Sequence, residues 1–322
     1  MNRRNFLASM AGGAACAALG SCAAPARGVA EDGAEPPLAI VDAHAHFYDP
    51  ARPQGVPWPD QRDAVLYKTT LPAHYRAQPV PRKVAGVVVV EASPWVEDNR
   101  WILDLAAEEP LIVGVVGNLP VGTNVFADLL ERFAANPLFR GVRIRDPKPP
   151  RGIEDKAALA DLALLAERRL ALDLVGGSEI LAQAKFLAER LPELAIVIDH
   201  LAGVRIDGKA PPEDWLAALG ALVRHPRVFV KVSGLVEATG RKGRELPVHQ
   251  AFYRPVLDAL WRRFGPDRLL YGSNWPVCGH FAALATVQTL AADYFRARGR
   301  DAERKVFAEN AKAAYGWVER AA

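Results

Sequence analysis

Cysteine is scarce in this chain, and the little that is present excludes a fold built on disulfides. The three cysteines are Cys16, Cys22 and Cys278. The first two fall in an N-terminal targeting segment described below, so Cys278 is left without a stable partner. We therefore expect no disulfide framework, even in an oxidising compartment.

The sequence also lacks a dominant charge. Lys and Arg number 40 against 37 Asp and Glu, a net charge of +3, and Arg3 and Arg4 of the targeting segment supply part of the excess. Past this segment the charges are mixed, without a basic stripe interleaved with aromatics, which disfavours nucleic-acid binding. No second long hydrophobic run follows, and the remaining length suits one α/β barrel.

The first 22 residues predict an export signal. Arg3 and Arg4, followed by Phe6 and Leu7, resemble a twin-arginine signal peptide, which carries folded proteins across the bacterial inner membrane. The small-residue run at 8–19 is too short and too rich in Gly and Ala to span a membrane stably. We expect an exported mature protein.

Two processing sites are open in this segment. Leu19-Gly20-Ser21-Cys22 resembles a lipoprotein site, at which Cys22 becomes a lipidated membrane anchor, whereas an ordinary signal-peptidase site near 24–26 releases a periplasmic protein. Residues 23–37, rich in Ala, Pro, Gly and acids, are expected to form a disordered tether. Residues 38–322 then form the folded domain.

Short aliphatic runs alternate with stretches of helical spacing in this domain. The alternation predicts an α/β fold with a parallel sheet, and eight strands predict a single-domain (β/α)8 TIM barrel. The segment 161–169 has the apolar stripe of a helix, and seven prolines in 49–81 predict a long loop over the active-site face. The expected strands are 39–41, 84–91, 111–119, 141–144, 171–175, 195–199, 228–232 and 269–271.

Catalytic groups of such barrels stand at the C-terminal ends of the strands, and the first strand runs into His44 and His46. Their i, i+2 spacing turns both side chains to one side of an extended segment, where two imidazoles can share a metal ion. The alternative is a hydrogen-bonded pair in a polar pocket. Their place at the end of the first of eight strands favours the metal.

Further polar residues follow the other strands. Asp199 and His200 come directly after the apolar run of the sixth strand with no local helix or turn to require them, which favours a catalytic role over a core histidine. Arg143 and Arg145 lie on one side of the fourth strand and can clamp a carboxylate or polyhydroxylated substrate, although a structural ion pair is the alternative for either alone. At the ends of strands seven and eight, the residues assigned to substrate binding are Lys231, Ser233 and Trp275.

Six blocks in chain order resemble the amidohydrolase-2 family, and more narrowly its branch of sugar lactonases and 2-pyrone-4,6-dicarboxylate lactonases. They span essentially the whole mature chain. The blocks are VDAHAH at 41–46, GVR at 141–143, IDHLAG at 198–203, KVSGL at 231–235, LYGSNWPVC at 270–278, and the Asn-Ala and Tyr-Gly pairs within 310–316.

The resemblance implies a barrel hydrolase in which His44, His46 and His200 line the pocket and an aspartate at position 274 activates water for attack on a lactone or ester carbonyl. Position 274 is Asn here, and a carboxamide cannot accept a proton near neutral pH. We therefore expect Asn274 to limit hydrolysis rather than abolish it, and Asn274→Asp to raise the rate. The remaining candidates for the base are Asp199, Asp42 and a metal-activated water.

The fifth strand is a second departure from the pattern. It supplies no histidine where metal-binding members of the superfamily often place a ligand, so a tight tetrahedral site on His44 and His46 lacks a third protein ligand. One divalent ion, zinc or manganese, and a metal-independent mechanism both stay open, since this branch includes metal-independent lactonases.

The favoured function is hydrolysis of a lactone or ester of a small sugar acid or dicarboxylate. The alternatives are a metal-dependent decarboxylase on the same barrel, and a tethered binding protein whose catalysis is weakened by Asn274. The expected partner is a small-molecule substrate and, if Cys22 is lipidated, the membrane surface.

Overall fold

The computed structural model describes residues 38–145 and 152–320. The expected export signal, the lipidation site at Cys22 and the tether at 23–37 lie outside the described residues. Within the described part of the chain, no helix combines the length and the apolar character that crossing a membrane requires.

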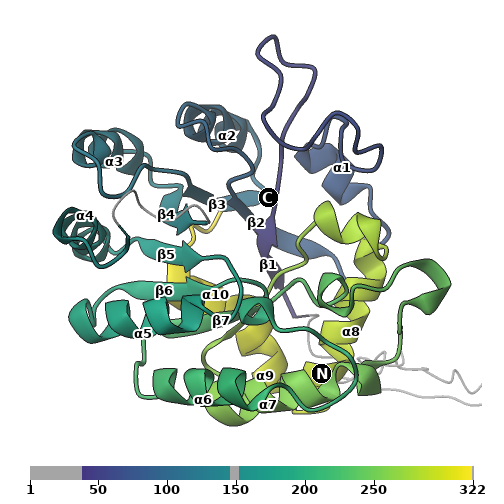
Figure 1. The fold of residues 1–322 in the computed structure, drawn as a ribbon. Helices are drawn as coiled ribbons and strands as arrows, with labels where there is room; N and C mark the ends of the chain where they lie inside the picture. The colour runs from purple at the N-terminus through teal and green to yellow at the C-terminus, as the bar shows by residue number, and fades with distance from the viewer. Residues whose placement is uncertain (1–37, 146–151, 321–322) are drawn as a thin grey trace, which may run out of the picture. The chain divides into compact units, whose positions relative to one another are not determined.

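Eight parallel strands form the centre of the fold, and each pairs with the next one in the chain (Figure 1). The ring is joined where Ala45 pairs with Trp275, and the His46 N–H donates to the Trp275 carbonyl at 2.8 Å. This confirms the predicted (β/α)8 barrel. The strands are β1 (Ile40–Ala45), β2 (Val84–Val90), β3 (Ile112–Gly117), β4 (Phe139–Ile144), β5 (Ala171–Leu174), β6 (Ala195–Ile198), β7 (Val228–Val232) and β8 (Leu269–Tyr271).

Helices α1 to α8 surround this sheet in chain order, whereas α10 lies across the centre of the ring (Figure 1). The predicted helix at 161–169 is α4, which begins earlier because the Asp155 side chain caps it by accepting from the Ala157 N–H. The α-helices are α1 (Pro72–Arg76), α2 (Asp98–Glu108), α3 (Phe126–Ala134), α4 (Lys156–Glu167), α5 (Ile180–Arg190), α6 (Glu213–Leu222), α7 (Arg254–Phe264), α8 (Leu284–Arg296), α9 (Arg300–Arg304) and α10 (Asn310–Tyr315).

Short 3-10 turns occupy several loops after the strands, and one π-helical turn precedes α10. The 3-10 turns are η1 (His200–Gly203), η2 (Glu237–Thr239), η3 (Gly243–Glu245), η4 (Gln250–Phe252) and η5 (Val277–His280), and the π-turn is η6 (Lys305–Glu309). Two of these turns, η1 and η2, lie in the loops after β6 and β7 and therefore carry residues at the C-terminal face of the barrel.

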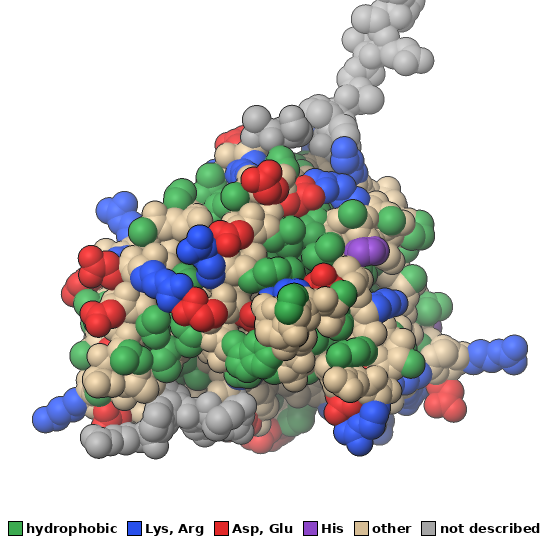
Figure 2. All heavy atoms as spheres, turned by 90° about the horizontal axis from the view of Figure 1, so that it is seen from above, with side chains coloured by type: hydrophobic (Ala, Val, Ile, Leu, Met, Phe, Trp, Pro, Cys, Tyr) green, Lys and Arg blue, Asp and Glu red, His purple; other side chains and the backbone are tan. Residues whose placement is uncertain are grey.

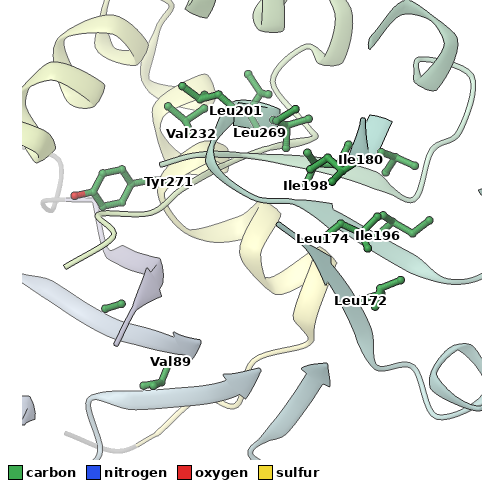
Figure 3. Close-up of a cluster of buried hydrophobic side chains, with 14 of the residues drawn as sticks. Val89, Leu172, Leu174, Ile180, Ile196, Ile198, Leu201, Val232, Leu269 and Tyr271 are labelled. Atoms are coloured by element: carbon green, nitrogen blue, oxygen red, sulfur yellow. The ribbon is translucent and has the colours of Figure 1, made fainter. Parts of the chain in front are cut away.

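Strand residues alternate between two apolar layers. On β5 and β6, Leu172, Leu174, Ile196 and Ile198 belong to the large cluster between the strands and the helices, part of which Figure 3 shows. Their neighbours belong to a smaller cluster that α10 enters, with Ala171, Ala195, Val197, Ala311 and Tyr315 among its members. Side chains alternate between the two faces of a strand. Because both faces of these strands are buried, their sequences are unbroken apolar runs.

The proline-rich segment 49–81 contains only the short helix α1, in line with the loop that was expected. It folds back on the strand ends, because Tyr48 and Thr70 exchange backbone hydrogen bonds of 2.9 Å and the Trp58 ring lies 5.8 Å from the His46 ring. Figure 2 shows acidic, basic and apolar side chains interspersed over the face it draws. No single charge sign dominates that view.

Candidate active site

An irregularity in β1 turns His44 toward the site. The step from Asp42 to Ala45 covers three residues of β1 but only two of its partner strand, Val87 to Val89, so β1 carries one extra residue. This changes the side-chain alternation within the strand. It also corrects the expected strand end, because pairing with β2 continues through Ala45 and His44 lies inside the strand rather than after it.

Three imidazoles meet at this end of the barrel. The His44 ring lies 5.0 Å from the His46 ring and 4.4 Å from the His200 ring, centroid to centroid. His46 Nδ1 lies 2.8 Å from the Val90 carbonyl, and His200 Nδ1 lies 2.9 Å from the Ser233 hydroxyl. His46 and His200 thus each have one ring nitrogen engaged by a neighbouring strand or loop, which orients the ring.

Burial keeps these imidazoles neutral. Removal from water lowers the pKa of His44 well below its usual range, and the charge of Lys231 acts in the same direction. Burial, followed by the charge of Arg143, lowers the pKa of His46 likewise. Burial lowers the pKa of His200 to about 4, although Asp199 opposes the shift. A neutral imidazole is the form that binds a metal or donates a hydrogen bond without carrying charge.

A column of paired charges fills the barrel below the histidines. The Lys231 ammonium donates to Asp173 at 2.5 Å, lies 2.9 Å from Asp199, and reaches His44 Nδ1 at 3.2 Å. Tyr315 closes the column from α10 by donating to Asp173 at 2.8 Å. Burial alone would raise the pKa of Asp199, but Lys231 and His44 hold it well below its usual range.

Arg143 of β4 and Arg145, directly after its end, meet the same carboxylate. Arg143 Nε and Arg145 Nε donate to Glu91 Oε1 at 2.8 and 3.0 Å, and Arg143 also lies 3.6 Å from Asp199. The Arg143 side chain is buried, whereas that of Arg145 is 46% exposed. Arg145 therefore has donors free to face solvent or a ligand, while Arg143 is held by two acids.

Asn274 is bonded to a carboxylate that no sequence block had indicated. Its backbone N–H donates to the His44 carbonyl at 2.8 Å, and its side-chain Nδ2 donates to Glu237 Oε1 at 2.9 Å. Its φ of 57° lies in the left-handed region, which asparagine tolerates better than most residues. Burial raises the pKa of Glu237 to about 7, outweighing the hydrogen bond from Asn274.

The remaining predicted substrate-binding residues lie in different surroundings. Ser233 is buried beside His200, and Lys231 is fully buried in the charge column. Trp275 packs edge-on against Tyr75 at 5.3 Å and Phe47 at 6.0 Å between ring centroids. Contact of Lys231, Ser233 and Trp275 with a substrate stays a prediction.

A group of donors suited to a metal lies at the same point. Ligand atoms of His44, Asp199 and His200 all fall within 4.8 Å of one another. Among the described residues His44 Nε2 is buried without a hydrogen-bonding partner, as an unused ligand atom would be. Two imidazoles and a carboxylate are typical ligands of zinc. The group differs from the predicted pair, because Asp199 and His200 join His44 and His46 is not a member.

Three acidic residues of the site were missed by the sequence reasoning. Asp173 carried a signal, because a charged residue in the middle of a buried apolar strand requires a partner. Glu91 ended a predicted strand and was passed over. Glu237 had no such signal, since it lies five residues beyond the end of β7 in a loop without periodicity.

A (β/α)8 barrel with imidazoles, acids and a lysine gathered at the C-terminal strand ends defines a barrel enzyme of the hydrolytic type. The comparison with known families gives the particular one. Residues 41–317 match the Amidohydrolase family, so the chain belongs to it. It is a hydrolase of that family, as its sequence predicted.

Relatives of known activity and structure agree with this assignment. The chain is 33% identical to an L-fucono-1,5-lactonase of Burkholderia ambifaria over 84% of its length and 93% of the relative's. Its fold matches an amidohydrolase of Burkholderia multivorans with bound HEPES at a TM-score of 0.74 and 25% identity, covering 87% of this chain and all of that one. A zinc-bound structure of a Burkholderia multivorans amidohydrolase gives a TM-score of 0.72 and 26% identity over the same shares.

Proposed function

We propose that this chain hydrolyses the cyclic ester of a small sugar acid, with a 1,5-lactone as the first substrate to test. The observation that carries the proposal is the 33% identity to an L-fucono-1,5-lactonase across 84% of this chain. The site supports it, because neutral imidazoles, a half-exposed guanidinium and acids adjoin one another at the strand ends. These are the groups that acyl transfer to water needs.

The reaction adds water to the lactone carbonyl and opens the ring. The water oxygen bonds to the carbonyl carbon, the ring C–O bond breaks, the ring oxygen leaves as an alcohol and the acid product ionises. Where no metal is bound, His200 is suited to polarise the carbonyl, because its imidazole is neutral and oriented by Ser233. Arg145 is suited to hold the hydroxyl groups or carboxylate of the substrate, since nearly half of its side chain is exposed.

We further propose that the site holds one divalent cation, zinc or manganese, through His44, Asp199 and His200, with His46 beside them. The unpartnered His44 Nε2 and the neutral imidazoles fit such an ion, and zinc is bound in a structure 26% identical to this chain. When bound, a divalent ion supplies Lewis-acid polarisation of the carbonyl or a more acidic water. The Lys231 ammonium beside Asp199 supports the metal-independent alternative, which the same experiment tests.

The test is hydrolysis of a panel of sugar-acid 1,5- and 1,4-lactones by the purified domain, followed by acid release at controlled pH. We expect turnover of at least one 1,5-lactone, and a loss with His200→Ala of about 10² to 10⁴-fold. Metal analysis of the pure protein, then chelation and reconstitution with zinc or manganese, measures the dependence on the ion. Absence of turnover across the panel with either metal added contradicts the proposed function.

We also propose that the enzyme is exported, in a periplasmic form or anchored through a lipidated Cys22. The support is the sequence of residues 1–22, with paired Arg3 and Arg4 before an apolar run and a lipoprotein-like site. Replacement of both arginines by lysine is expected to retain the protein in the cytoplasm. Palmitate labelling that persists in Cys22→Ala excludes the lipid anchor, and normal export of the double lysine variant excludes the twin-arginine route.

A further inference from the structure

We propose that Glu237 is the general base of this hydrolase, replacing the strand-eight carboxylate for which Asn274 stands. The inference rests on the proposed function, lactone hydrolysis. The resemblance to the family leaves position 274 without a base, and the structure places another carboxylate at hydrogen-bonding distance from that position, 2.9 Å from the Asn274 amide.

The chain path explains how Glu237 reaches this position. After β7 the backbone turns at Gly234, whose φ is +66°, and a Cβ there would lie 3.1 to 3.3 Å from atoms of the His200 side chain. The loop thus passes directly against His200 before η2 begins at Glu237. The partner Asn274 is itself tied to His44 through its backbone N–H. Two successive hydrogen bonds through Asn274 therefore link Glu237 to β1, the strand that carries His44.

Only one oxygen of the Glu237 carboxylate accepts a hydrogen bond from another side chain among the described residues. Oε1 accepts from Asn274, whereas Oε2 is buried with no hydrogen-bonding partner among the described residues. An ionised carboxylate in this condition is costly unless something else solvates it. A water molecule between Oε2 and the substrate would satisfy the oxygen and is the nucleophile that the reaction requires.

The charge surroundings keep this carboxylate basic. Tyr253 and Cys278 are the titratable neighbours that feel its charge, and burial raises the pKa of both, so both stay neutral. No ion pair to Glu237 is found within residues 38–145 and 152–320, unlike Asp199, which is paired with Lys231. Burial raises the pKa of Glu237 to about 7, near the value at which a general base works best in neutral solution.

The proposed step divides the work between the two side chains. Because Nδ2 of Asn274 donates to Glu237, the Oδ1 of Asn274 is left to accept a hydrogen bond from the attacking water. An O–H bond of that water breaks as its oxygen bonds to the lactone carbon, and the proton passes to Glu237 while the carbonyl electrons move to oxygen. When the intermediate collapses, the ring C–O bond breaks and Glu237 returns the proton to the ring oxygen.

The experiment exchanges the amide and the carboxylate. Glu237→Gln is expected to lower kcat by about 10² to 10⁴-fold with little change in KM. The double variant Glu237→Gln with Asn274→Asp keeps one amide, one carboxylate and their hydrogen bond, and puts the acid at the family's position. It is expected to regain at least about tenfold of the lost kcat. Glu245→Gln, an exposed acid on the same loop, is the matched control and should behave as the parent.

The pH–rate profile separates a base from a structural residue. The kcat of the parent should fall as pH decreases below about 7. This acid limb of the profile should disappear in Glu237→Gln and return at another pH in the double variant. If the parent hydrolyses a lactone and folded Glu237→Gln keeps its rate and its limb, Glu237 is not the base while the proposed function stands. If the parent hydrolyses no lactone on the panel, the function and this role for Glu237 are both overturned.

Discussion

Two buried carboxylates of this barrel have opposite electrostatic surroundings. Asp199, in the interior column, lies within ion-pair distance of Lys231 and Arg143. Glu237 accepts a neutral hydrogen bond from Asn274, and its second oxygen has no partner from another side chain among the described residues. The pKa of Asp199 is accordingly held well below its usual range, whereas burial raises that of Glu237 to about 7.

The difference separates charges that support the site from a charge that can react. A carboxylate held ionised by an ammonium is a weak base and a good anchor for an imidazole or a metal. A carboxylate without a cationic partner costs stability but can exchange a proton at neutral pH. Removing the Lys231 cation should therefore lower the stability of the fold, whereas removing the charge of Glu237 should raise it.

The largest effect is expected from Lys231→Met. The substitution keeps an unbranched apolar stem but leaves Asp173 buried without its cation and Asp199 with Arg143 alone, which typically costs about 3 to 5 kcal/mol. Urea unfolding followed by circular dichroism measures the loss. Lys185→Met, which removes an exposed pair with Glu189, is the control and should change stability by less than about 0.5 kcal/mol. Equal losses in the two variants would contradict the account of the column.

Glu237→Gln should stabilise the protein, increasingly as pH rises. A carboxyl with a pKa of about 7 in the fold and an ordinary value when unfolded binds more protons in the folded state between pH 4.5 and 7. Stability of the parent therefore falls as pH rises through this window, and the variant escapes that loss.

The gain in the free energy of unfolding should level off above about pH 8, at no more than about 3 kcal/mol, the energy equivalent of that shift. Unfolding midpoints of both proteins from pH 5 to 9 give the difference directly. A difference that is independent of pH, or that has the opposite sign, would show that Glu237 has an ordinary pKa.

The barrel could be predicted because its signal repeats. Eight apolar runs gave all eight strands, and several ends were right because both faces of each strand are buried in apolar layers. The expected end of β1 at residue 41 was wrong for a local reason. The polar residues Asp42 and His44 look like the start of a loop, yet they continue the strand because Asp42 bonds to Ser273 and Tyr75.

The sequence indicated site residues mainly at or near the C-terminal ends of apolar strands. His46 and His200 were found in this way, and family resemblance drew attention to Asn274. The sequence did not indicate Glu237, because its position depends on the turn at Gly234 and on a contact between two loops, neither of which has a periodic pattern. The mutual contact of Arg143 and Arg145 with Glu91 was likewise invisible, since it joins different strands through side chains.

The structure changes the expectation for Asn274→Asp as a single substitution. It would place a second carboxylate at hydrogen-bonding distance from Glu237, and two such groups share one proton, so one pKa of the pair rises strongly. We expect kcat at pH 7 to fall by up to about tenfold and the acid limb of the pH–rate profile to move upward. Asn136→Asp, in the turn before β4, is the control. A faster variant at pH 7 would restore the view that Asn274 alone limits the rate.

The smallest effect is expected from Tyr315→Phe, at the bottom of the charge column. The hydroxyl donates to Asp173 inside the barrel, with 2.8 and 3.0 Å to the two carboxylate oxygens, and no solvent is available to replace it. Its loss should cost about 1 to 2 kcal/mol, less than the loss of Lys231, because the ion pair to Asp173 remains.

Tyr294→Phe is a matched control, since that hydroxyl donates to Asp258 at 2.8 Å on the outside of the barrel and Asp258 keeps two arginines. Asp258 is also partly exposed, so water can take over the lost bond. Thermal unfolding of both variants compares them, and a control loss as large as that of Tyr315→Phe would mean that enclosure in the barrel adds nothing to the hydrogen bond.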